Sequence, residues 1–169
     1  MARLPELDVE ETVAEAERAL RRGRPTMPPF DRATRHLGAG TFVSAMVLGG
    51  VFQRHPHLVV GVLELGASWV TGWVRRLDAM AASSRAMGLR PLPQGASAYV
   101  RRNVRVAPSC WEEPVDVRAL PDVFVFGSDY PHPEGGRTPV DRFLRCLTPH
   151  ADDAVEAFFA RNAATLLPA

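Results

Sequence analysis

Apolar residues follow two different spacings along the chain, and these predict alternating helices and strands. Helical spacing predicts helices over 41–54, 69–87, 140–147 and 152–167. Short, nearly continuous valine-rich runs predict buried strands over 58–65 and 123–126, and a weaker run predicts one over 104–107. This alternation, which begins at residue 58, is typical of α/β proteins with parallel strands.

The first 29 residues form a separate region. Asp8 and Glu11 have the spacing of a capping box, and apolar residues at helical spacing follow them as far as Gly23. Three prolines between 23 and 29 then remove backbone donors, so no regular element is expected there. We therefore divide the chain into an N-terminal helix with a proline-rich linker (1–29) and a second region (30–169).

Composition excludes several kinds of chemistry. The 169 residues are 46% hydrophobic, which is enough for one domain with a buried core. The sequence contains no lysine, so a Schiff-base lysine, a phosphate-loop lysine and a carbamylated lysine bridging two metals are all excluded. The net charge of +1 gives no electrostatic reason to expect nucleic acid or an acidic membrane as partner.

Features of the termini and cysteines predict a cytoplasmic protein. Cys110 and Cys146 lie far apart without Cys-x-x-Cys spacing, which is typical of reduced thiols. The N-terminal segment is acidic where a signal peptide needs an apolar stretch. No apolar run approaches the ~20 residues of a membrane span, so no membrane partner is expected.

Candidate chemistry follows two of the predicted strands, because working groups in parallel α/β folds lie where strands end. Glu64 closes one apolar run; it could orient a substrate or ligand, or pair with Arg101 or Arg102. Asp129 follows another run and could serve as an oxygen ligand or general base. His132 adds an imidazole that titrates near neutrality. The alternative is that Asp129 caps a turn and His132 is merely exposed.

Six motifs in order, over roughly residues 30–167, resemble the amidohydrolase-related family. They are Gly50-Val-Phe-Gln-Arg-His-Pro-His-Leu58, Val62-Leu-Glu-Leu-Gly-Ala-Ser-Trp69, Arg76-Leu-Asp78, Tyr99-Val-Arg-Arg-Asn103, Phe126-Gly-Ser-Asp-Tyr-Pro-His-Pro-Glu-Gly135 and Asn162-Ala-Ala-Thr-Leu-Leu167. Members of this family are metal-dependent (β/α)8 barrels. They include hydrolases and decarboxylases such as aminocarboxymuconate-semialdehyde decarboxylase.

The resemblance implies a partial (β/α)8 barrel in which 58–64, 104–107 and 123–126 are strands six, seven and eight. It implies that Asp129 is a metal ligand and proton acceptor, beside Glu64 and His132, the catalytic candidates already drawn from the residues. The cofactor implied is a divalent metal, zinc first and manganese second. The reaction implied is hydrolysis or decarboxylation of a small carboxylate-bearing or aromatic substrate.

Departures from the family pattern leave two functions open. The family's His-x-His pair on strand one and histidine from strand five have no counterpart that we can place. His55-Pro56-His57 has the spacing of the pair but lies in a predicted turn, and His36, before the helix predicted from 41, is best explained as a surface or capping residue. A complete barrel needs about 250 residues.

We therefore expect a truncated family member whose chemistry is impaired unless another chain completes the barrel. The alternative is a non-catalytic remnant or interaction module that forms homo-oligomers, because an open half-barrel exposes strand edges and apolar faces.

Overall fold

The computed structural model describes residues 29–83, 86, 88, 91–109, 112, 119–132, 135–147 and 152–167. The N-terminal helix and most of the linker that the sequence predicts lie outside these residues. The described strands are β1 (Val60–Val62) and β2 (Val104–Val106). The described helices are α2 (Pro29–Leu48), α3 (Val51–Arg54), α4 (Val70–Ala82), α5 (Ala96–Asn103), α6 (Pro139–Leu147), α7 (Asp152–Glu156), the π-helix η2 (Ala157–Arg161) and α8 (Asn162–Ala164).

Parallel strand pairing confirms the predicted α/β character. β1 and β2 pair in parallel, with Val60 opposite Val104. Beyond β2, the amide of Val106 donates to the Val123 carbonyl, and the amide of Val125 donates to the Val106 carbonyl. The run predicted as a strand over 123–126 therefore lies beside β2, although it forms a single parallel bridge at Phe124 rather than a full strand. These three segments place their carboxyl ends at one edge.

The helix predicted over 41–54 is longer and broken. It begins at Pro29 as α2 and stops at Leu48, and α3 follows after two glycines. Gly50 adopts a left-handed conformation with φ of 72°, which glycine accommodates at little cost and which ends the regular helix. The expectation that His36 precedes the helix was wrong, because it lies within α2 and its ring stacks on Trp69 at 6.0 Å between centroids.

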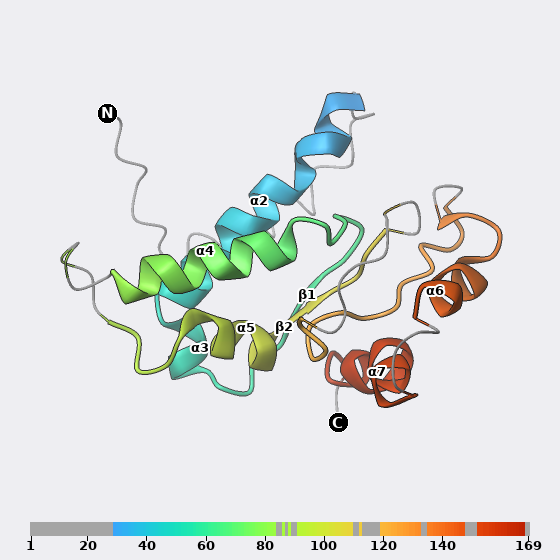
Figure 1. Ribbon diagram of the computed structural model, residues 1–169. Helices are drawn as coiled ribbons and strands as arrows, with labels where there is room; N and C mark the ends of the chain where they lie inside the picture. The colour runs from blue at the N-terminus through green and yellow to red at the C-terminus, as the bar shows by residue number, and fades with distance from the viewer. Residues whose placement is uncertain are drawn as a thin grey trace.

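The hydrophobic core lies between the strands and the helices that cover them. Figure 1 shows α2, α4 and α5 on one side of the strand pair and α6 and α7 on the other. The core cluster joins Val62, Val104 and Val106 of the strands to helix residues such as Val74 of α4 and Phe158 of η2. No helix within the described ranges combines the length and apolar character that crossing a membrane requires.

Buried Arg105 of β2 connects three elements. Its guanidinium donates to the carbonyl oxygens of Arg101 (3.0 Å) and Val104 (2.8 Å) and to the hydroxyl of Thr165 (3.0 Å). Burial lowers the pKa of Arg105, an effect that the nearby Asp122 carboxylate opposes. The bond to Arg101 satisfies a carbonyl in the last turn of α5, so this side chain fastens α5 and the C-terminal region to the strand pair.

Candidate functional site

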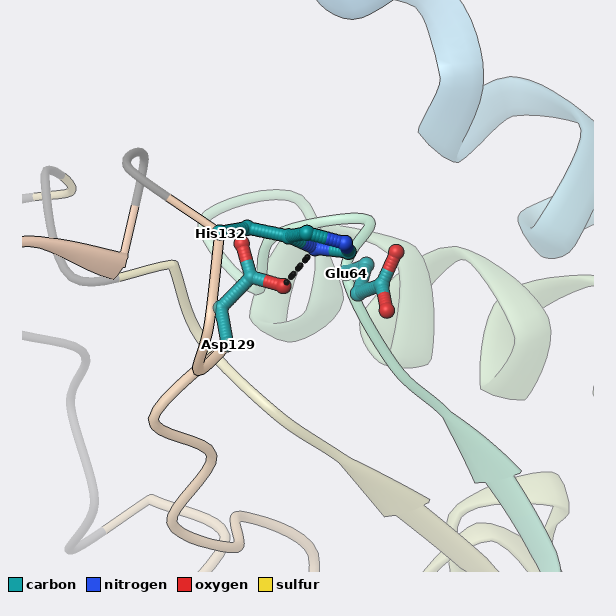
Figure 2. Close-up of side chains that lie close together, drawn as sticks. All are labelled: Glu64, Asp129 and His132. Atoms are coloured by element: carbon teal, nitrogen blue, oxygen red, sulfur yellow. Dashed lines mark hydrogen bonds and ion pairs between the residues drawn. The ribbon is translucent and has the colours of Figure 1, made fainter.

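Side chains from two strand ends converge at the carboxyl edge of the parallel segments. Glu64 follows β1 by two residues, and Asp129 and His132 lie on the loop that follows 123–126. Figure 2 shows the three side chains close together, with the His132 ring between the carboxylates of Asp129 and Glu64 in this view. One potential ligand atom from each residue lies within 4.8 Å of the other two. The structure thus brings together all three candidate residues that the sequence identified.

Both acids of the site adopt a strained backbone. Glu64 has φ of 62° and Asp129 has φ of 58°, and they are the described non-glycine residues with positive φ. The left-handed region costs an ordinary L-residue roughly 1–2 kcal/mol, although aspartate tolerates it better than most. Surrounding contacts must therefore hold each acid in this conformation.

The loop that carries Asp129 is closed by its own hydrogen bonds. The amide of His132 donates to the Asp129 carbonyl at 2.8 Å, and the amide of Gly135 donates to the His132 carbonyl at 3.1 Å. A side chain at 135 would collide with the Ser128 carbonyl oxygen, so this close return of the chain requires glycine. The Tyr130–Pro131 peptide bond is cis. These contacts fix Asp129 and His132 relative to each other.

A hydrogen bond joins the side chains of Asp129 and His132. The Nδ1 atom of His132 lies 3.0 Å from the Asp129 Oδ1 atom, as the dashed line in Figure 2 marks. When Nδ1 carries the ring proton, it donates a hydrogen bond to the carboxylate, and Nε2 is left as a hydrogen-bond acceptor. An imidazole oriented in this way can take up a proton or ligate a cation through Nε2. Asp129 is half-buried, whereas Glu64 and His132 are exposed, so the cluster faces solvent.

The donor set suits a divalent metal ion. Two carboxylates and an imidazole are the oxygen and nitrogen ligands that zinc and manganese accept in proteins. The proximity of the three donor atoms makes these residues a group that could hold such an ion. Glu134, which lies on the same loop, falls outside the described residues.

Other charged residues considered from the sequence lie in different surroundings. Arg101 contacts Asp122 at 3.4 Å and donates to the Ala119 carbonyl at 2.6 Å, and Arg102 donates to the Phe52 carbonyl at 2.9 Å. His55 and His57 are exposed in the turn between α3 and β1. In the described part of the chain, neither histidine belongs to the group around Asp129.

One buried acid near the site was missed by the sequence reasoning. Glu112 is only 9% exposed, and its carboxylate accepts hydrogen bonds from the backbone amides of Ala67, Ser68 and Ser109. Two of these amides lie just beyond Glu64 in the loop that leads into α4. The surrounding sequence, Trp-Glu-Glu-Pro, is polar and proline-bounded, a pattern typical of surface loops, so it carried no signal for a buried acid.

Comparisons with known proteins agree with the fold. The family model described as Amidohydrolase matches residues 36–169. An amidohydrolase from Mycobacterium avium subsp. paratuberculosis is similar in structure, with a TM-score of 0.69 and 27% identity over 96% of this chain. A 5-carboxyvanillate decarboxylase from Sphingomonas paucimobilis is also similar, with a TM-score of 0.55 and 25% identity over 73% of this chain.

These likenesses cover 41% and 38% of the two solved chains, so the present chain spans less than half of their length. No curated protein sequence matches the chain. The family match nevertheless covers most of the sequence and includes all three residues of the cluster. The chain therefore belongs to the amidohydrolase family.

Proposed function

We propose that this chain carries part of a metal-dependent amidohydrolase-type active site. In this proposal Glu64, Asp129 and His132 hold one divalent cation, zinc first and manganese second. The observation that supports it is the convergence of one donor atom from each residue within 4.8 Å. The position of the group at the carboxyl edge of parallel segments adds support, because ligands in such folds bind at that edge.

The proposed reaction is hydrolysis or decarboxylation of a small carboxylate-bearing or aromatic substrate. A bound cation would supply Lewis-acid polarisation of the substrate or activation of a water molecule. In hydrolysis Asp129 would accept the proton of the attacking water, and in decarboxylation it would return a proton to the substrate carbon that loses CO2. Its hydrogen bond with the His132 Nδ1 atom leaves Nε2 as the ring atom that can ligate a cation. Glu64, across the site on the β1 side, orients the substrate or the cation. The similarity to a 5-carboxyvanillate decarboxylase supports the carboxylate-bearing class.

The proposed site needs further groups from outside this chain. We assign β1, β2 and the segment 123–126 to strands six, seven and eight of a (β/α)8 barrel, in keeping with their parallel pairing. The chain spans 41% of the length of the similar amidohydrolase, so these segments account for part of such a barrel. A barrel-completing chain would supply the remaining histidine ligands, and the present chain alone would be impaired in turnover.

Metal titration tests the proposal directly. The full chain is titrated with Zn²⁺ and with Mn²⁺ by calorimetry, alongside Glu64→Gln, Asp129→Asn and His132→Gln. We expect one equivalent to bind and each variant to weaken binding by at least about tenfold, since each removes one ligand.

His57→Gln is the matched control, because His57 is an exposed histidine in the turn before β1. It should leave the affinity within about twofold, a difference of under 1 kcal/mol. A wild-type chain that is folded by circular dichroism and binds neither ion contradicts the proposal. So does binding that all three site variants retain unchanged.

A second candidate is a non-catalytic module that associates with itself or with another chain. It is favoured by two exposed apolar side chains that flank the site acids: Leu63 is 53% exposed and Tyr130 is 88% exposed. Apolar surface of this kind beside a strand end suits a protein contact. This function requires no metal. A chain that forms oligomers but binds neither Zn²⁺ nor Mn²⁺ therefore supports the interaction module over the enzyme.

A further inference from the structure

We propose that Glu112 is a positioning residue that sets the place of Glu64 in the cluster. One of its two tests, the change in metal affinity, rests on the proposed metal function. The other, the rate of amide exchange in the loop, does not. The Glu112 carboxylate accepts from the Ala67 amide at 2.8 and 3.1 Å, from the Ser68 amide at 3.0 Å and from the Ser109 amide at 2.9 Å. Ala67 and Ser68 lie three and four residues after Glu64 on the same loop.

Close packing against Gly66 makes this attachment rigid. Gly66 has φ of 71°, and a Cβ atom there would lie 2.7 Å from the Glu112 Oε1 atom. The carboxylate thus rests directly on the backbone two residues beyond Glu64. Glu64 holds a left-handed conformation that needs external support. Hydrogen bonds that the Ala67 and Ser68 amides, just after Glu64, donate to the Glu112 carboxylate provide that support.

Glu112 is also tied to the other side of the site. Arg142 of α6 donates to the Glu112 carbonyl oxygen at 3.2 Å. Helix α6 follows the loop that carries Asp129 and His132. The backbone carbonyl of Glu112 thereby contacts α6, while its side chain accepts hydrogen bonds from the loop after Glu64. A single residue therefore links the loop after Glu64 to the helix that follows the Asp129 loop.

Asp78 offers a matched control. Its carboxylate accepts a hydrogen bond from the Ser97 amide at 2.8 Å, in the first turn of α5. Like Glu112, it is an acid that satisfies a backbone donor near the start of a helix. Asp78 lies in the second half of α4, which runs away from the loop after β1 (Figure 1). Loss of its carboxylate should affect stability without moving Glu64.

The experiment compares the full-length wild type with Glu112→Gln and Asp78→Asn. Glutamine has nearly the same shape, but its NH2 group cannot accept from the backbone N–H groups that it would face. We expect exchange of the Ala67, Ser68 and Ser109 amides to become about tenfold faster in Glu112→Gln and to stay unchanged in Asp78→Asn. Zn²⁺ affinity should fall by about 10- to 100-fold in Glu112→Gln alone.

The outcomes separate this proposal from the proposed function. Unchanged amide exchange in Glu112→Gln overturns the positioning role, as does an equal loss of metal affinity in Asp78→Asn. A folded wild type that binds no metal overturns the metal function. Even then, the positioning role is supported if Glu112→Gln, and not Asp78→Asn, shows faster amide exchange in the loop and shifted NMR signals of Glu64. If Glu112→Gln does not fold, Glu112→Asp, which keeps the charge on a shorter side chain, is measured in its place.

Discussion

Two buried asparagines hold the chain where it enters the parallel segments. The amide nitrogen of Asn103 donates to the carbonyl oxygens of Pro56 and Leu58, just before β1. The amide nitrogen of Asn162 donates to the carbonyl oxygens of Pro121 (2.7 Å) and Phe124 (2.9 Å). Both asparagines act by satisfying buried backbone groups rather than through chemistry.

Replacement of Asn162 by leucine should destabilise the fold. Leucine has the same branched arrangement of side-chain atoms but leaves the Pro121 and Phe124 carbonyls without their donor, which should cost about 2–4 kcal/mol. Urea unfolding followed by circular dichroism measures the loss. Gln53→Leu, at an exposed position of α3, is the control and should change stability by less than about 0.5 kcal/mol. Equal stability of Asn162→Leu and wild type would show that these bonds contribute nothing net.

At the residue scale, the sequence was most informative about which side chains approach each other. Glu64 and Asp129 could be singled out because each ends an apolar run, and parallel strands bring such ends together. The left-handed backbone of Glu64 left no mark in the sequence, since glutamate is not among the residues that favour this region. Glu112 was missed because its partners are backbone amides, which have no sequence signature. Two of them, those of Ala67 and Ser68, lie 45 and 44 residues earlier in the chain.

At the element scale, the π-helix near the C-terminus has an identifiable use. In η2 the Asn162 amide donates to the Ala157 carbonyl, five residues back, rather than to Phe158. The Phe158 carbonyl is therefore available to the Phe126 amide, which donates to it at 2.8 Å. One irregular turn thus hydrogen-bonds the C-terminal helices to the segment that leads into the Asp129 loop.

An exposed ion pair spans this irregular turn and should make stability slightly dependent on pH. Arg161 contacts Asp153 at 2.7 Å, and this bond lowers the pKa of Asp153 below its ordinary value. Because the folded pKa is depressed, the contribution is complete above the unfolded pKa of aspartate. It is lost as the pH falls through the folded value.

We expect Asp153→Asn to melt at a slightly lower temperature than wild type at neutral pH, with the difference vanishing in acid. The effect should be small, because both groups are exposed and screened by salt. Thermal melts from about pH 7 down to about pH 1.5 measure it, because the acid end must lie below the folded pKa, which is itself below the ordinary aspartate value. Asp152→Asn, in the same helical turn, should show a smaller change. A difference that persists in acid would exclude the carboxylate as its source.

Element types were more predictable than element ends. Periodicity correctly indicated helices within 41–54, 69–87 and 140–147 and parallel pairing within 58–65 and 104–107. It could not show that Gly49 and Gly50 divide α2 from α3, because glycine lowers the stability of a helix without always ending it. Nor could it show the π-helix within 152–167, whose register depends on a bond to a distant strand segment.

At the scale of the whole molecule, apolar surface remains exposed beside the site. Leu63 lies between β1 and Glu64 and is 53% exposed. Among the described residues, β1 is hydrogen-bonded along one edge, to β2. A strand edge next to an exposed leucine favours association with a further chain. Both proposed functions, a completed barrel and an oligomerising module, make use of this surface.

Association through this surface should depend on Leu63. Sedimentation of the wild type is expected to show oligomers, and Leu63→Gln should weaken the association about tenfold by removing apolar area from the contact. Met80→Gln is the control, because Met80 is a similarly exposed apolar residue of α4. A wild type that is monomeric at all concentrations measured would argue against an open half-barrel surface.

The left-handed backbone at Glu64 sets a trade-off between stability and binding. Glycine at this position relieves the strain, so Glu64→Gly should raise the free energy of unfolding by about 1 kcal/mol while abolishing the carboxylate. Glu64→Gln also loses the carboxylate but keeps the strain, and should bring no such gain. Urea unfolding and metal titration of both variants measure the two effects. A protein that becomes more stable as it loses its cation identifies Glu64 as a position where folding is sacrificed for binding.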